Sequence, residues 1–252
     1  MAVSTQPAKP AESNLAQEHG VIPRLENGDR LTRAEFERRY DAMPELKKAE
    51  LVEGEVYMPS PVRHGRHSHP HTRLVAWLAN YETDTPGVEA GDNGSIRLDL
   101  DNEPQPDAYL IIRPERGGQA RISEDDYIEG APELVAEVAS SSASYDLGKK
   151  LNAYRRNGVR EYVVWRVLDR QVDWFVNREG RFELMPPAAD GILRSTVFPG
   201  LWLDPAALVL GEKATVKAIL QHGLNSPEHA GFVARLGEGK RDITGGGEKG
   251  RH

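Results

Sequence analysis

The chain of 252 residues contains no cysteine, and this absence excludes several kinds of site at once. Without thiols there is no disulfide framework, no thiolate metal ligand and no cysteine nucleophile. Long apolar runs are also missing, since no stretch approaches the roughly 20 residues that a membrane-spanning helix needs. Met1–Gly20 lacks the apolar segment of a signal peptide. The sequence therefore favours a soluble protein of the cytoplasm, without a membrane partner.

A surplus of basic residues is missing as well. The chain has 32 lysines and arginines against 39 aspartates and glutamates, which gives a formal net charge of −7. A protein that coats nucleic acid relies on a broad positive surface, and this composition argues against such a role. The same composition does not exclude an enzyme that contacts nucleic acid through one local groove.

The remaining composition, 38% hydrophobic and 28% charged, is typical of one medium-sized domain with extensions. Residues 1–27 are rich in small and polar residues without periodicity, which predicts a disordered N-terminal arm. The domain itself is expected over residues 28–210, and a C-terminal helical extension over 211–236, with a short helix from Ala214 to His222. Residues 237–252 are Gly-rich and charged, which predicts a disordered tail.

Two apolar runs are interrupted by acids. Asp107 immediately precedes the run Ala108–Ile112, and Glu137 lies inside the run Leu134–Val138. Continuous apolar runs of this length are typical of central strands that are covered on both faces. A carboxylate buried there without a partner is costly, so each needs a cation, a basic side chain or a proton. The two acids are therefore either members of structural ion pairs or ligands of a shared metal ion.

The other periodic segments predict few helices and several strands. A helix is expected after Thr32, with Thr32 and Glu35 forming a capping box, and a strand pair is expected around Gly54. Strict alternation predicts a half-buried strand in "GSIRLDLD", with Ile96, Leu98 and Leu100 directed inward. A second helix is expected to direct Leu74, Val75, Leu78 and Tyr81 to one face.

The segment "YDLGKKLNAYRRNGV" predicts a helix that ends at Asn157 and Gly158, and a meander of three strands follows it. Together these elements predict an α+β fold with a mixed central sheet flanked by helices. In this fold Lys150 lies on the helix that follows the strand of Glu137.

Asp107, Glu137 and Lys150 together form a candidate metal site. Mg²⁺ prefers hard oxygen ligands and retains several waters, so two carboxylates and a main-chain carbonyl near Val138 would suffice. A lysine beside them could polarise a water molecule and stabilise charge that develops on a phosphate. The set predicts hydrolysis of phosphodiester bonds with Mg²⁺ or Mn²⁺.

Four segments carry a resemblance to a known family. They cover most of the chain between Thr32 and Leu208, and they read "AELVEGEVYMPSPVRHG", "QPDAYLII", "YIEGAPELVAEVASSS" and "YDLGKKLNAYRRNGVREYVVW". In this order they resemble the Uma-type family of restriction-endonuclease-like proteins, within the PD-(D/E)XK nuclease superfamily. The resemblance implies a nuclease fold and a nucleic-acid substrate, DNA in the first instance.

The resemblance also implies roles for single residues. Asp107 and Glu137 would be the metal ligands, Glu50 an additional acid of the catalytic set, and Lys150 the catalytic lysine. In the commoner nuclease motif the lysine stands two residues after the acid, where this chain has Ala139. The catalytic lysine is therefore expected on the following helix. His64 is expected as an accessory residue, because the family tends to carry a histidine after "SP".

Each assignment has a structural alternative. Lys149 and Lys150 could be solvated helix residues, with Asp146 pairing with Lys150 along the helix. The four histidines of "HGRHSHPH" match no established zinc-ligand spacing. Six basic residues could line a nucleic-acid groove or simply be solvated and complement a helix end; they are Arg63, Arg66, Lys149, Arg155, Arg156 and Arg160, and Lys150 would lie beside them.

The rival function is a non-catalytic interaction module that retains the nuclease fold. The acidic balance of the chain favours this rival, whereas the set of two acids and a lysine favours the enzyme. A homodimer remains open as an alternative to a monomer.

The composition of the two terminal segments generates a first prediction. Deleting Met1–Gly20 and Glu238–His252 is expected to leave the melting temperature nearly unchanged, because neither segment has an apolar face to bury. Thermal unfolding of the full and the shortened chains, followed by circular dichroism, measures this. A large fall in melting temperature on removing either segment would show that it docks on the domain.

Overall fold

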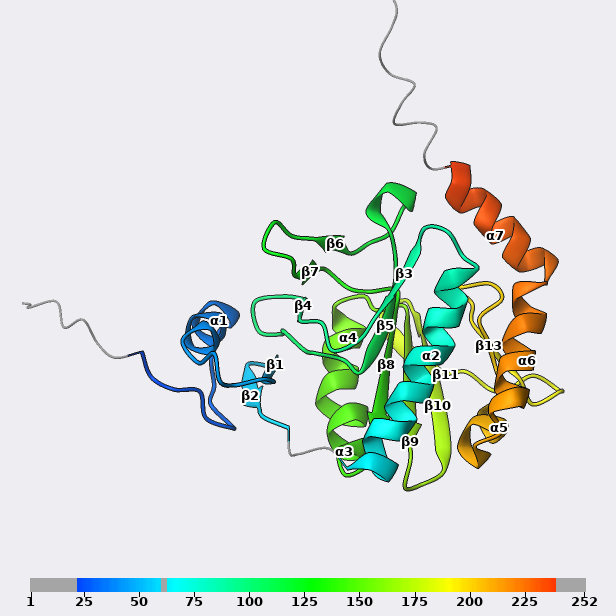
Figure 1. The fold of residues 1–252 in the computed structure, drawn as a ribbon. Coiled ribbons are helices and arrows are strands. Elements are labelled where there is room, and N and C mark those ends of the chain that lie inside the picture. The colour runs from blue at the N-terminus through cyan, green and yellow to red at the C-terminus, as the bar shows by residue number, and fades with distance from the viewer. Residues whose placement is uncertain (1–21, 60–62, 239–252) are drawn as a thin grey trace, which may run out of the picture.

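A computed structural model describes residues 22–59 and 63–238 of the chain (Figure 1). Most of the predicted N-terminal arm and nearly all of the predicted tail lie outside these ranges. Among the described helices, none has the length and apolar character needed to span a membrane.

A six-stranded mixed sheet forms the centre of the molecule. Its strand order is β11-β10-β9-β8-β5-β3, and only the β8–β9 pair is parallel. The strands are β3 (Val88–Gly91), β5 (Ala108–Ile112), β8 (Leu134–Ala139), β9 (Glu161–Arg166), β10 (Gln171–Arg178) and β11 (Arg181–Leu184). The α+β fold class is confirmed, and so is the expected adjacency of β5 and β8, in which Ala108 is paired with Ala136.

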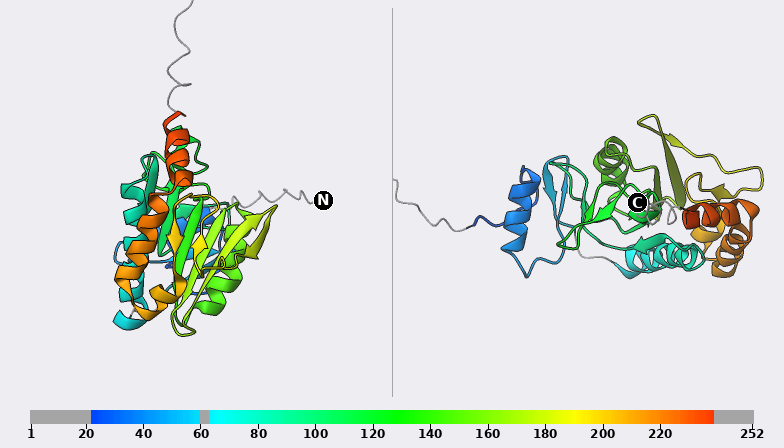
Figure 2. Two further views of the ribbon diagram at one scale, coloured as in Figure 1. Left: turned by 90° about the vertical axis from the view of Figure 1, so that its right-hand side faces the viewer. Right: turned by 90° about the horizontal axis from the view of Figure 1, so that it is seen from above.

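Helices cover both faces of this sheet (Figure 2). On one face, α2 (His69–Thr83), α5 (Pro205–Leu210), α6 (Lys213–Leu224) and α7 (Pro227–Glu238) share a core with Leu134, Ala136 and Val138 of β8. On the other face, α4 (Leu151–Arg156) packs against Val135 and Ala139 of the same strand. Side chains alternate across a strand, so Glu137 is directed to the face that α4 covers.

The N-terminal segment folds into a small unit of its own. It contains α1 (Arg33–Asp41), β1 (Glu50–Val52) and β2 (Glu55–Tyr57), and its core includes Phe36. Leu25, which lies before residue 28, where the sequence placed the start of the domain, belongs to this core and is buried.

The turn between β1 and β2 and the start of α1 both depend on local chemistry. Glu53 and Gly54 have φ values of +56° and +70°, which is the left-handed pair that a tight two-residue hairpin turn requires. Thr32 does precede α1, but its side chain forms no capping bond. The predicted capping box is absent because Glu35 pairs with Arg38 and Arg39 instead.

The strand predicted in "GSIRLDLD" is much shorter than expected. Only β4 (Ile96–Arg97) forms, and it belongs to a separate three-stranded sheet with β7 (Ile128–Glu129) and β6 (Arg121–Ile122). Ile96 is buried as predicted, but Leu100 is 74% exposed. The reason is a turn in which Asp99 bridges to Asn102 and which carries Leu100 out of the strand direction.

The C-terminal extension is part of the domain rather than an appendage. The single short helix predicted over 214–222 is α6, which is longer, and α7 follows it. Leu220, Leu224 and Phe232 belong to the same core as the central strands. A side chain at Gly223 would place its Cβ 2.1 Å from the carbonyl oxygen of Gly200, so glycine at this position allows α6 to pack closely against the backbone of Gly200. A short pair of strands, β12 (Leu193–Arg194) and β13 (Trp202–Leu203), lies beneath these helices.

The packing of α6 generates a second prediction. Leu220→Ala is expected to lower the free energy of unfolding by about 2–5 kcal/mol, because it opens a cavity in the main core. Leu210→Ala, on the exposed end of α5, is the matched control and is expected to change stability by less than about 0.5 kcal/mol. Urea unfolding measures both. If the two variants were equally stable, α6 would be an independent appendage.

Candidate functional site

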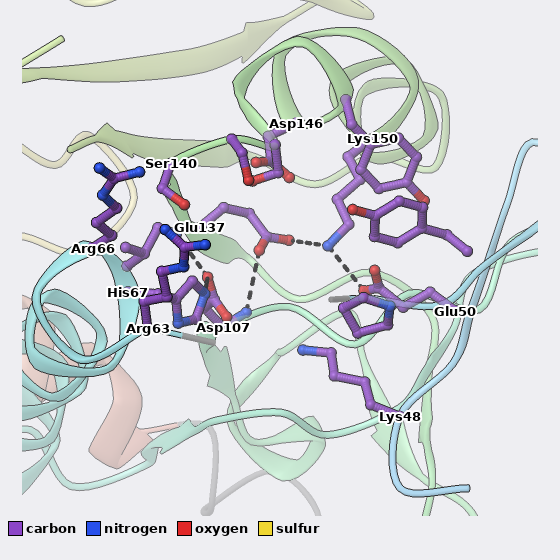
Figure 3. A pocket seen from close by; sticks show the side chains of 16 residues that line it. Lys48, Glu50, Arg63, Arg66, His67, Asp107, Glu137, Ser140, Asp146 and Lys150 are labelled. Carbon is purple, nitrogen blue, oxygen red and sulfur yellow. Dashed lines mark hydrogen bonds and ion pairs between the residues drawn. The ribbon is translucent and has the colours of Figure 1, made fainter. Parts of the chain in front are cut away.

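A cavity of about 600 Å³ opens where β5 begins and β8 ends (Figure 3). Four acids with exposed fractions between 2% and 4% line it, together with one lysine that is 4% exposed. These residues are Glu50, Asp107, Glu137, Asp146 and Lys150. The structure thus brings together all four residues expected as the catalytic set, and it adds Asp146 to them.

Asp107 is fixed by contacts on several sides. Its Oδ2 accepts a hydrogen bond of 2.8 Å from the backbone N–H of Val138, and the Nε2 of His67 lies 3.2 Å from the same oxygen. His71 contacts the main-chain oxygen of Asp107 at 2.7 Å. Burial alone would raise the pKa of Asp107, but His67 and the Val138 N–H outweigh burial and lower the pKa to about 2. Asp107 is therefore a carboxylate at neutral pH.

Lys150 joins two of the other acids. Its Nζ lies 2.8 Å from Oε1 of Glu137 and 2.8 Å from Oε1 of Glu50. Burial opposes the positive charge of Lys150, but the surrounding carboxylates outweigh it and hold the pKa well above its usual range. The charge on Lys150 is therefore permanent at physiological pH.

Glu137 and Glu50 each accept a further hydrogen bond in addition to the contact with Lys150. Oε1 of Glu137 also accepts a hydrogen bond of 3.0 Å from the hydroxyl of Tyr154, and Glu50 accepts one of 2.7 Å from the backbone N–H of Gln105. Burial raises the pKa of Glu137, Lys150 opposes this, and the neighbouring acids add to it. Glu137 thus gains a proton more readily than a solvated glutamate.

The structure also separates Glu50 from its two neighbours in sequence. Glu50 is buried in β1, whereas Glu53 pairs with Arg156 and Glu55 pairs with Lys149 near the surface. Val52 pairs with Glu55 and Glu50 with Tyr57, so Glu50 and Glu55 lie on the same face of the hairpin at different positions along it, and strand alternation alone could not make this distinction.

Two π-helical turns present side chains to the pocket. One covers Asp146–Lys150 and the other His64–Ser68, directly before α2. In the first turn, Asp146 and Lys150 are buried while Lys149 is 44% exposed at its side chain. The hydroxyl of Tyr162 donates to the main-chain oxygen of Asp146 at 3.1 Å and so supports the widened turn. Such turns inside helices often occur at functional sites.

The histidine that contacts Asp107 is not the one that the resemblance indicated. His64 is exposed and stacks on His69, with a ring-centroid distance of 5.8 Å, and it does not line the cavity. His67 contacts Asp107 instead. His67 and His71 are four residues apart, but this spacing does not indicate which residue they contact, so the sequence held no signal for the contact with Asp107.

Asp146 is the acid that sequence reasoning missed as a site residue. The sequence indicates only a pairing with Lys150 along a helix, but Asp146 is 3% exposed and lines the cavity. Burial raises its pKa, and Lys150 opposes the rise. Across the described ranges, no group of three or more histidines, aspartates and glutamates is arranged to hold a metal ion. Two carboxylates supplemented by waters are the smaller ligand set that Mg²⁺ accepts.

Other buried acids show what a structural role looks like in this fold. Glu133 accepts hydrogen bonds from the backbone N–H groups of Ile112 and Gln119, at 2.9 and 2.8 Å. Glu161 accepts bonds from Ser195 and Thr196. Each of these carboxylates fastens a loop through main-chain and hydroxyl donors. The acids of the cavity differ, since they gather around one lysine at the wall of an open space.

The predicted basic groove is divided by the structure. Lys149 and Arg156 are paired with glutamates, Arg155 donates to the main-chain oxygen of Gly180, and Arg160 donates to Gln119. Arg63 and Arg66 line the cavity, and so does Lys48, which sequence reasoning did not include.

The mixed sheet and the acids at the ends of β5 and β8 define a restriction-endonuclease-like α+β protein. A family model described as "Putative restriction endonuclease", Uma2, matches residues 33–206, and the chain belongs to this family. The helices α6 and α7 lie beyond the matched range.

Among solved structures, the chain is similar to a protein described as "a putative nuclease belonging to DUF820" from Anabaena variabilis. The sequence identity is 16%, the TM-score is 0.49, and the match covers 68% of this chain and 97% of that chain. No curated protein matches the chain.

The ion pairs of Lys150 generate a third prediction. In EDTA, Lys150→Ala is expected to lower the free energy of unfolding by about 3–5 kcal/mol near pH 8, because it leaves buried carboxylates without a cation. The loss is expected to shrink near pH 5. A carboxyl group whose pKa is raised in the folded state binds its proton more tightly there than in the unfolded state. Binding of that proton therefore stabilises the folded state at low pH, and this stabilisation is lost as pH rises.

Urea unfolding of the variant at both pH values measures this effect. Lys149→Ala is the control, because that lysine is partly exposed, and a change below about 1 kcal/mol is expected at either pH. An equal loss for Lys150→Ala at both pH values would show that Lys150 acts through packing rather than charge.

Proposed function

We propose that this protein is a metal-dependent endonuclease that hydrolyses phosphodiester bonds of nucleic acid, and that its substrate is DNA. One observation carries the proposal: Asp107 and Glu137, at the ends of neighbouring central strands, line one cavity with a permanently charged Lys150. Membership of a restriction endonuclease family supports the same chemistry.

The charges of the cavity fit a divalent cation. Four buried carboxyl groups face a single buried lysine, and such an excess must be balanced by protons or by further cations. Carboxylate oxygens are the hard ligands that Mg²⁺ and Mn²⁺ prefer. We assign Asp107 and Glu137 as the residues that would hold the ion.

A main-chain carbonyl is available beside these two acids. The pairing of β5 with β8 runs from Leu110–Leu134 to Ala108–Ala136 and stops there. The N–H of Val138, the next residue on this edge of β8, is occupied by the Asp107 carboxylate. The N–H and C=O groups of one strand residue point to the same edge, so the Val138 carbonyl belongs to the same corner of the cavity.

Bound there, a divalent ion would polarise the phosphate and lower the pKa of an attacking water molecule. The residues of the chain supply the rest. Lys150 provides a fixed positive charge for the negative charge that develops on the phosphate. Glu50 keeps the ammonium group of Lys150 in place, and His67 keeps the carboxylate of Asp107 in place.

The second candidate is the non-catalytic interaction module. It is favoured by the net charge of −7 and by the lack, within the described part of the chain, of a metal cluster with three protein ligands. Such a module could keep metal binding while lacking hydrolysis, so the two candidates differ in one measurable property.

Cleavage and metal binding together generate a fourth prediction. The wild-type chain is expected to nick supercoiled plasmid DNA with Mg²⁺ or Mn²⁺ and not with EDTA. Asp107→Asn and Glu137→Gln are expected to lose cleavage, because each removes a charged ligand from the ion. Glu124→Ala is the control, since Glu124 is an exposed acid outside the cavity, and its cleavage is expected to be unchanged.

The melting temperature gives a readout that does not depend on activity. Mn²⁺ is expected to raise it for the wild type, more near pH 8 than near pH 6, because ligand carboxyl groups must lose their protons to bind. Asp107→Asn is expected to abolish this rise. Stabilisation by Mn²⁺ without nicking would favour the interaction module. The absence of both stabilisation and nicking would refute the metal site.

A further inference from the structure

Three cations on the rim of the cavity have no acidic partner among the residues that the structure describes. Lys48, Arg63 and Arg66 line the same cavity as the four acids. Lys48 donates a hydrogen bond of 2.9 Å to the side-chain oxygen of Asn93, which is neutral, and Arg63 and Arg66 are exposed. Over residues 22–59 and 63–238, no carboxylate lies within 4.0 Å of the charged nitrogens of these three residues.

The three cations stand on opposite sides of the acids. Lys48 comes from the segment before β1 and lies on the side of Glu50, whereas Arg63 and Arg66 lie on the side of Asp107, at the start of the helical segment that leads into α2 (Figure 3). Because this helical segment begins at His64, the positive end of its dipole lies beside the two arginines and adds to their charge.

The floor of the cavity makes these cations necessary for an anionic substrate. Glu50, Asp107, Glu137 and Asp146 outnumber Lys150, so the floor repels a phosphate until cations compensate for it. Neighbouring basic residues cannot do this, because Lys149 and Arg156 are already paired with glutamates. Among the residues that line the cavity, the positive charge that remains for a substrate lies on the rim.

We propose that Lys48, Arg63 and Arg66 bind backbone phosphates on the two sides of the scissile bond and so lay the strand across Asp107 and Glu137. This inference rests on the proposed function, and it makes the three residues positioning residues. Contacts with phosphates carry no sequence information by themselves, so this part of the recognition is independent of base sequence.

The number of phosphate contacts determines how strongly binding depends on salt concentration. Each neutralised phosphate of duplex DNA contributes about −0.9 to the slope of log Kobs against log salt concentration, so three contacts give a slope of about −2.7. Affinity would then fall roughly 40-fold between 50 and 200 mM salt, far less than for a protein with 6–10 phosphate contacts.

The fifth prediction concerns binding of the full-length chain to a short fluorescent DNA duplex. Glu137→Gln is used as the background, in Mg²⁺, so that cleavage does not disturb the measurement. Adding Lys48→Ala, Arg63→Ala or Arg66→Ala is expected to weaken the slope by about 0.9 each, and the triple variant is expected to lose nearly all salt dependence. Lys149→Ala and Arg156→Ala remove the same charge from paired residues, and they are expected to keep the slope.

Kinetics of the otherwise wild-type chain provide a second readout. The rim variants are expected to raise KM for plasmid cleavage while kcat at saturating DNA stays nearly unchanged, which a folding defect would not produce. If the wild type cleaves and the rim variants keep both slope and KM, the inference is overturned and the nuclease stands. If the wild type neither binds nor cleaves DNA, the proposed function itself is refuted, and the inference falls with it.

Discussion

The two ion pairs of Lys150 connect parts of the chain that are far apart in sequence. Glu50 belongs to the N-terminal unit, Glu137 to the central strand β8, and Lys150 to the π-helical turn before α4. All three side chains are almost fully buried, so each needs the others to be tolerable inside the protein. Lys150 is therefore the buried link between the N-terminal unit and the sheet at the wall of the cavity, and the pairs Glu53–Arg156 and Glu55–Lys149 join the same parts nearer the surface.

Buried acids have two distinct uses in this fold. Glu133 and Glu161 stand at the entrances of β8 and β9, where main-chain and hydroxyl donors satisfy them and loops become fixed. Asp107 lies at the start of β5 and Glu137 near the end of β8, so both are at the opposite end of β8 from Glu133. There they line a cavity together with further acids. A single buried carboxylate can be satisfied by N–H groups alone, but a group of four retains an excess of negative charge that a cation relieves.

The charge of the cavity also changes from floor to rim. Acids form the floor, and Lys48, Arg63 and Arg66 stand above them, so under the proposed function a metal ion would bind in one layer and a phosphate in the other. In a chain with a net charge of −7, these three cations supply local positive charge beside the acids. Lys149 and Arg156 add little to it, because each is paired with a glutamate.

The sequence alone determined the central strands, the end of α4 and the family, because these depend on local signals: apolar runs, turn residues and short motifs in a fixed order. It also pointed to Asp107 and Glu137, since an acid inside or beside an apolar run is costly wherever the strand is placed, and the family resemblance pointed to Lys150. The contacts of His67, the burial of Asp146 and the division of the basic residues were decided only by the tertiary structure. Their side chains meet partners from distant segments, and the π-helical turns that direct them leave no periodicity in the sequence. The inclusion of α6 in the core was decided in the same way, because an amphipathic helix does not specify which apolar surface it will cover.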